Sequence, residues 1–122
     1  GYVIIAHNDT VKEKPDMVRR FVLATLMAVK AAQADPDASV MAMANYFGPE
    51  QFDEVAITQA RKVLDVTLSI LISKNNPDKI LGWNSEKDFA VALELFKKYK
   101  ELQTDLPPTA FFTNEFVPTQ MP

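Results

Sequence analysis

The sequence of 122 residues contains no cysteine, one histidine and only three glycines. Without cysteine there is no disulfide, no CxxC redox pair and no thiolate zinc site. The glycines Gly1, Gly48 and Gly82 stand far apart, whereas a phosphate-binding loop needs several glycines close together. We therefore expect no metal site, no nucleotide site and no cofactor.

The charge balance and the hydropathy argue against two further classes. The chain has 13 basic and 16 acidic residues and a formal net charge of -3, whereas nucleic-acid-binding proteins gather lysine and arginine to neutralise phosphates. No apolar run approaches the roughly 20 residues that cross a bilayer. We expect neither a nucleic-acid partner nor a membrane span.

The first residues predict a short strand. In the run Tyr2–His7, β-branched and aromatic side chains occupy both parities, a pattern typical of a strand buried on both faces of a parallel sheet. One strand makes no sheet, so we expect its partners in another chain or in further sequence. The segment therefore predicts that the chain is cut from a longer protein.

Four helices are predicted after a polar turn that follows this strand. Pro15 and the pair Asp35-Pro36 mark two helix starts, and Ser85 and Asp88 have the spacing of a capping box before the last helix. The expected helices cover residues 15–33, 35–47, 50–75 and 85–102, with strand and crossover at 1–10 and an extended, non-helical tail at 103–122 that Phe111, Phe112 and Phe116 anchor.

Two features of these helices bear on function. The second half of the helix expected at 50–75 is apolar around most of its circumference, so it needs cover on more than one face. The pairs Asp35/Asp37 and Asp53/Glu54 have the residue types of a metal or acid–base site. Because each pair stands at a helix start, where negative charge is favourable, we predict capping instead.

Three residues are candidates for ligand contact. His7 and Asn8 end the predicted strand, and the carboxyl ends of parallel strands face the ligand crevice. The alternative for His7 is a local hydrogen bond, and a single histidine beside Asn8 and Asp9 is weak support for a catalytic triad. Trp83, the only tryptophan, either stacks on an aromatic or cationic ligand or locks the connector between two helices. We predict no catalytic residue.

Two parts of the sequence carry a family resemblance. The first is VIIAHNDTVKEKPDMVRRFVLATL at residues 3–26 with ADPDA at 34–38, and the second is GWNSEKDF at 82–89, LELFKKY at 93–99 and FTNEFVP at 112–118. Together they resemble the periplasmic solute-binding proteins of the nitrate/sulfonate/taurine and thiamine-pyrimidine-precursor type. The resemblance runs along essentially the whole chain, although Phe89 stands where the family often has Trp and Lys14 where it often has Asn.

This resemblance implies a fold and a function. The parent fold is a two-lobed α/β periplasmic binding protein of type II, and residues 1–122 are a single segment from its C-terminal part, mainly α with four helices after one short strand. The implied function is capture of a small organic solute, such as a thiamine pyrimidine precursor or a sulfonate/taurine-like anion, for an ABC permease. The implied location is the bacterial periplasm, or a lipid anchor outside the cytoplasmic membrane, and the implied protein is no enzyme.

Two alternatives stay open. A pyrimidine-precursor synthase shares the resemblance but needs a reactive histidine and iron-binding residues outside this chain. A free-standing helical module would bury the apolar faces of its third helix in a homodimer, whereas a piece of a longer protein would exchange its strand between copies or aggregate. On the favoured interpretation the 122 residues alone bind the solute weakly, because half of the crevice lies elsewhere.

Overall fold

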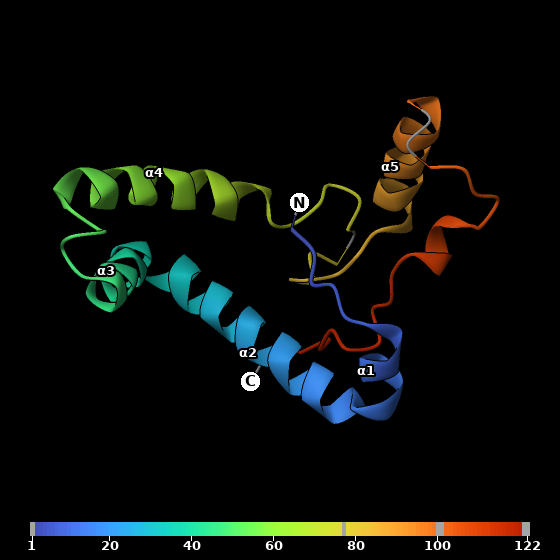
Figure 1. Cartoon of the computed structure of the whole chain (residues 1–122), viewed down its shortest axis with the longest axis horizontal. Helices are drawn as coiled ribbons and strands as arrows, with labels where there is room; N and C mark the ends of the chain where they lie inside the picture. The colour runs from blue at the N-terminus through green and yellow to red at the C-terminus, as the bar shows by residue number, and fades with distance from the viewer. Residues whose placement is uncertain (1, 77, 100–101, 121–122) are drawn as a thin grey trace.

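The computed structural model describes residues 2–76, 78–99 and 102–120, and its regular structure is helical (Figure 1). This confirms the prediction of a mainly α chain, while the two-lobed parent fold stays a prediction. Among the described residues, no helix is long and apolar enough to cross a bilayer. The elements are α1 (Asn8–Glu13), α2 (Pro15–Ala34), α3 (Pro36–Phe47), α4 (Glu54–Ile70), α5 (Glu86–Lys98) and the short 3-10 helix η1 (Pro108–Ala110).

The prediction of a strand at Tyr2–His7 is wrong. The segment is not helical, but no other described segment pairs with it, and its side chains are exposed, up to 88% for Ile5. A strand exists only where its backbone N–H and C=O groups join those of a neighbour. The segment thus has the sequence pattern of a strand, but the described residues contain no sheet for it to join.

α1 replaces the polar turn expected after that segment. His7 is its N-cap, because the imidazole Nδ1 accepts a hydrogen bond from the Asp9 N–H at 3.2 Å. The helix ends at Glu13, and its C-cap Lys14 donates its N–H to the Thr10 carbonyl at 3.0 Å. Pro15 then starts α2 in the position where a missing N–H costs nothing. Histidine is an unusual cap, so the sequence pattern did not reveal this helix.

The limits of α2 and α3 agree closely with the predicted helices. α2 ends one residue beyond the expected position, and the Asp35 carboxylate caps α3 by accepting from the Ala38 N–H at 2.9 Å. Gly48 ends α3 with φ +83°, a conformation that favours glycine. The predicted role of Asp35 as a cap is therefore confirmed.

α4 is shorter than the helix predicted at 50–75. The Asp53 carboxylate accepts from the Ala56 N–H at 2.8 Å and sets the first turn, as its predicted capping role requires. The residues before it form a turn in which the Phe52 N–H donates to the Gly48 carbonyl at 2.9 Å. At the other end α4 stops at Ile70, so the following residues are free to form the polar turns described below.

The start of α5 differs from the predicted capping box. Ser85 is the N-cap by backbone geometry, but its side chain makes no capping hydrogen bond. The Asp88 carboxylate does not reach back along the helix; it accepts a hydrogen bond from the side chain of Asn75 instead. A tertiary contact has thus replaced the local one. α5 also ends at Lys98, four residues before the predicted limit.

Three phenylalanines are predicted to anchor the C-terminal tail, and two of them, Phe112 and Phe116, pack against helices. Phe116 is buried on α2, with the Arg19 guanidinium 5.6 Å from its ring centroid, and the Phe112 ring lies 4.6 Å from that of Phe89 on α5. Phe111 is more exposed, at 39%. The prediction of a wholly non-helical tail is wrong at η1, where Pro108 is compatible with the first turn, and residues 121–122 lie outside the described part.

The main hydrophobic cluster lies along one side of α2. Apolar side chains at helical spacing on this helix meet residues from α1, from the connector between α4 and α5, and from the tail. Segments far apart in the sequence are therefore held together by α2. The cluster consists of Val18, Val22, Leu26 and Phe116, with Val11, Leu81 and Val117 packed against it.

The rest of the molecule is open. α2 and α4 both contact α3 and diverge from it (Figure 1). The accessible surface is 9417 Å² for 13.7 kDa, whereas a compact monomer of this mass exposes about 6,600 Å². α4 has no buried residue, and its side chains Val63 and Val66 are each more than half exposed. The described residues thus do not provide the second cover that the apolar pattern of α4 predicts.

Candidate functional site

His7 and Asn8 lie where the extended N-terminal segment meets α1. Both residues are exposed, and the imidazole Nδ1 of His7 lies 3.2 Å from the Asp9 N and 3.4 Å from the Asp9 carboxylate. The local hydrogen bond considered for His7 is therefore present. It still leaves most of the imidazole accessible, since 76% of the side chain is exposed.

Trp83 lies in the connector between α4 and α5. Its backbone N–H donates to the Ile80 carbonyl at 3.2 Å, and the residue is exposed, at 38%. The residue before it, Gly82, has φ +83°, and a Cβ there would lie 2.8 Å from Leu26 Cδ2. The connector approaches α2 so closely at this point that only glycine fits without a shift of Leu26.

Two asparagine side chains hold the connector on either side of Trp83. The buried Asn76 donates through Nδ2 to the Ile80 carbonyl at 2.7 Å and accepts from the Ile80 N–H at 3.2 Å. Asn114 of the tail accepts from the Asn84 N–H at 2.8 Å and donates to the Asn84 carbonyl at 2.9 Å. Each amide therefore satisfies both backbone groups of one residue, as a neighbouring strand would.

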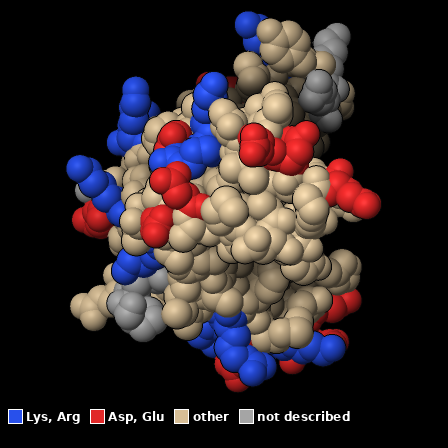
Figure 2. Space-filling view, turned by 90° about the vertical axis from the view of Figure 1, so that its left-hand side faces the viewer, with Lys and Arg blue, Asp and Glu red and all other residues tan. Residues whose placement is uncertain are grey.

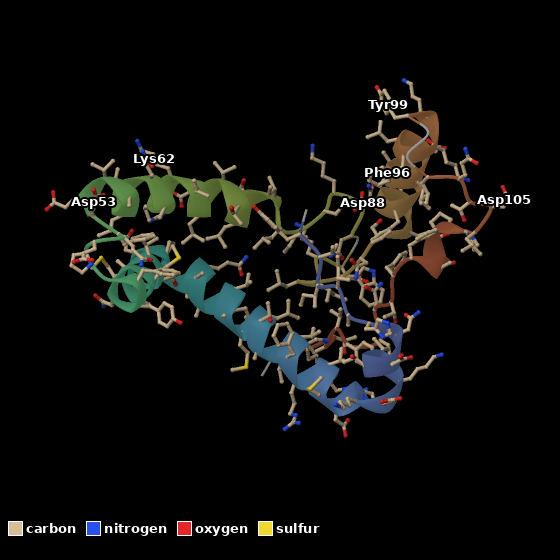
Figure 3. The ribbon with its side chains drawn as sticks, viewed as in Figure 1. Asp53, Lys62, Asp88, Phe96, Tyr99 and Asp105 are labelled. Atoms are coloured by element: carbon tan, nitrogen blue, oxygen red, sulfur yellow. The ribbon has the colours of Figure 1, made fainter. Side chains whose placement is uncertain are left out.

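A third polar contact ties α5 to the exit of α4. Asp88 lies where α5 meets the connector (Figure 3), and hydrogen bonds from Ser73 and Asn75 lower the pKa of its carboxyl group. The charge of Lys87 acts in the same direction, and partial desolvation opposes it. The ionised carboxylate is thus the form that this contact favours.

The three candidate ligand contacts belong to two segments that share one anchor. His7 and Asn8 stand about one turn before Val11, and Trp83 stands two residues after Leu81. Val11 and Leu81 both pack against the α2 cluster. Within the described ranges no hydrogen bond joins Trp83 to the other two. Their common role as ligand contacts stays a prediction.

The residues that hold the connector around Trp83, Asn76 and Asn114, were not among those predicted from the sequence. A signal was available, because asparagine in a turn commonly bonds the backbone nearby. Asn76 is such a case, since its partner Ile80 is four residues away. The partner of Asn114 is 30 residues away, so only the folded chain shows which backbone it meets.

Two shallow hollows lie away from these residues. One of ≈ 410 Å³ lies between α3 and α4, where the Arg61 guanidinium pairs with Asp65 and Asp37, which raise its pKa above the usual value. Another of ≈ 390 Å³ lies beside residues 102–105. In the part of the chain that the structure describes, no three acidic or histidine side chains converge to hold a metal ion.

Comparison with known families gives a match at the N-terminal end. Residues 1–39 match the family described as NMT1/THI5 like, which is 39 of the 122 residues. The matched part includes the segment with His7 and Asn8, α1 and α2, and it supports the predicted relation of this part to a family of solute-binding proteins. The second motif region, 82–118, lies outside the match. No curated protein and no solved structure matches the chain.

Proposed function

We propose that this chain is part of a protein that captures a small organic solute for an ABC importer, and that it acts by binding and not by catalysis. The observation that carries the proposal is the family match over residues 1–39, which contain two of the three candidate ligand contacts. The proposed location is the bacterial periplasm or the outer side of the cytoplasmic membrane. The proposed macromolecular partner is the importer's permease.

Of the two solute classes, the side-chain chemistry favours a thiamine pyrimidine precursor over a sulfonate. Trp83 is 38% exposed, and an indole ring is a surface on which a heterocycle can stack. Because His7 Nδ1 accepts from the Asp9 N–H, its Nε2–H is left to donate, and the amide of Asn8 can both donate and accept, which suits an aminopyrimidine edge. The Asp9 carboxylate, 3.4 Å from His7, places negative charge beside them and opposes a bound anion.

Ligand-observed NMR tests this assignment on the 122-residue chain, because saturation-transfer difference spectra detect weak binding. The two probes are an aminopyrimidine alcohol with the thiamine pyrimidine skeleton and taurine. We expect saturation transfer to the pyrimidine and less to taurine. The variants His7→Ala and Trp83→Leu should reduce the transfer, while Tyr99→Ala, which removes an exposed aromatic ring from the end of α5, should not.

Equal transfer in all three variants would reject His7 and Trp83 as contacts, and stronger transfer to taurine would reject the preference for the pyrimidine. The location is tested separately by reading the source DNA upstream of the Gly1 codon. An export signal in the same frame would support the importer proposal. A complete frame without such a signal would contradict it.

A further inference from the structure

Hydrogen bonds fix the peptide planes on both sides of Trp83. On one side its own N–H donates to the Ile80 carbonyl at 3.2 Å. On the other side the Trp83 carbonyl shares a planar peptide unit with the Asn84 N–H, which donates to Asn114 Oδ1 at 2.8 Å. Because the two planes that flank a Cα atom define its φ and ψ, these hydrogen bonds set the direction in which the Trp83 side chain leaves the backbone.

The two planes are held by different parts of the chain. Ile80 is held by Asn76, four residues away, so the first plane depends on local structure. Asn114 belongs to the C-terminal tail, 30 residues from Asn84, and its Nδ2 also donates to the Asn84 carbonyl at 2.9 Å. The second plane therefore depends on where the tail lies.

The tail presents Asn114 from a turn that is itself anchored. The Val117 N–H donates to the Asn114 carbonyl at 3.0 Å, and the Glu115 N–H donates to Thr113 Oγ1 at 3.1 Å. Phe116 is only 7% exposed in the cluster along α2, beside which the tail runs in Figure 1. Because Asn114 stands two residues before this buried ring, its amide is held in place relative to α2.

We propose that Asn114 is a positioning residue, which sets the Trp83 indole for contact with the solute. The inference rests on the proposed function and adds to it a residue of the tail, outside the segment that matches the family. The N-terminal segment with the other two candidate contacts is anchored on the same cluster through Val11. Asn114 thus places Trp83 relative to the helix that also supports those contacts.

A fixed backbone at Trp83 favours binding through entropy. A side chain that is already ordered loses less conformational freedom when a ligand stacks on it, so the ligand binds more tightly. Without the Asn114 amide, the plane between Trp83 and Asn84 loses the partner that holds it. The indole then samples more orientations, and the solute must order it on binding.

Time-resolved fluorescence anisotropy tests the first step, because Trp83 is the only tryptophan and gives the whole indole signal. We expect the amplitude of local indole motion to rise at least about twofold in Asn114→Ala. Asn75→Ala is the matched control. It also removes an amide that joins two segments, but the partner of that amide is Asp88 and not the backbone beside Trp83, so the anisotropy should stay unchanged.

Saturation-transfer NMR with the aminopyrimidine alcohol tests the second step. Transfer should fall at least about twofold in Asn114→Ala and stay unchanged in Asn75→Ala. A further control concerns the end of the molecule where α3 lies, because a broad uncharged area there, with acidic and basic side chains around it, can adsorb an aromatic probe (Figure 2). Tyr46→Ala removes a ring that is 84% exposed on α3 and should leave the transfer unchanged.

Unchanged anisotropy in Asn114→Ala would overturn the proposal, and so would greater indole motion with undiminished transfer. Equal changes in Asn75→Ala, or an equal loss of transfer in Tyr46→Ala, would also overturn it. If the wild type gives no transfer to either probe, the proposed function fails and this role of Asn114 fails with it. Transfer to the wild type with unchanged anisotropy in Asn114→Ala rejects the positioning role alone.

Circular dichroism checks the helix content of each variant. If Asn114→Ala unfolds, Asn114→Asp replaces it. The carboxylate keeps an acceptor for the Asn84 N–H but loses the donor to the Asn84 carbonyl, so both readouts should change in the same direction as for alanine.

Discussion

Single residues decide how the connector between α4 and α5 lies on α2. At Gly82 two causes favour glycine over any other residue: φ is +83°, and a Cβ would lie 2.8 Å from Leu26 Cδ2. At Gly48 φ is also +83°, but a Cβ there would have open space for 4 Å around it among the described residues, so only the backbone conformation favours glycine. The close approach at Gly82 is therefore a property of tertiary packing.

Gly82→Ala should lower the free energy of unfolding by roughly 2 kcal/mol, measured by urea denaturation. The left-handed backbone conformation disfavours alanine, and the added methyl group must displace the buried Leu26 side chain.

A double-mutant cycle separates these two causes. Leu26→Val removes the two Cδ atoms nearest to the new methyl group, so Gly82→Ala should cost less in the Leu26→Val background than in the wild type. An equal cost in both backgrounds would show that only the backbone conformation matters.

At the scale of elements, a polar contact between turns replaces the local capping box that the sequence predicts for α5, whereas α3 and α4 keep their predicted caps. α5 is held at its start by the carboxylate of Asp88 on Asn75, and the connector before it is held by Asn76 and by Asn114 of the tail. These contacts join α5, the connector and the tail. α5 also has apolar contacts, because Leu93 is buried and Phe89 lies against Phe112 of the tail.

The contact of Asp88 should make stability depend on pH. Its folded pKa is lowered, so its contribution is complete above the unfolded value of about 3.9 and is lost as the pH falls from there through the folded pKa. Asp88→Asn should therefore lower the free energy of unfolding at neutral pH by about 1 kcal/mol and flatten its decrease in acid. Urea denaturation at a series of pH values measures both effects.

Glu86→Gln is the control for this prediction, since it removes a carboxylate from the same first turn of α5. If Asp88→Asn and Glu86→Gln have the same pH dependence, the hydrogen bonds of Asp88 contribute nothing specific to stability.

At the scale of the whole molecule, burial is incomplete. An unfolded chain of 13.7 kDa exposes about 20,000 Å², so folding to 9417 Å² buries about 10,500 Å², compared with about 13,300 Å² for a compact monomer. Such an open fold leaves large apolar side chains on α2, α3, α4 and α5 accessible. Contact with further polypeptide would remove these apolar side chains from water.

The dependence of unfolding on urea should report this openness. The m-value scales with the surface exposed on unfolding, so at low protein concentration it should be about a fifth smaller than that of a compact domain of equal length. An m-value typical of a compact domain would show that the chain in solution buries more surface than this arrangement of helices does.

Much of the helical structure followed from local chemistry. Pro15, the pair Asp35-Pro36 and Gly48 act within one turn of their own positions, so the limits of α2 and α3 were predictable. The capping role of Asp53 was predictable for the same reason. Candidate ligand contacts could also be named from the sequence, although the packing of Val11 and Leu81, which stand near them in the chain, on the α2 cluster could not.

By itself, the sequence determined the helical class, the limits of α2 and α3, the capping carboxylates and the relation of the N-terminal segment to a family. Only the tertiary structure decided that Tyr2–His7 finds no neighbouring strand among the described residues, that Asp88 leaves its capping box for Asn75, and that Asn114 meets Asn84. The physical reason is the distance along the sequence between the residues that interact. Caps and turns depend on adjacent residues, whereas strand pairing and side-chain clamps depend on partners that only folding brings close.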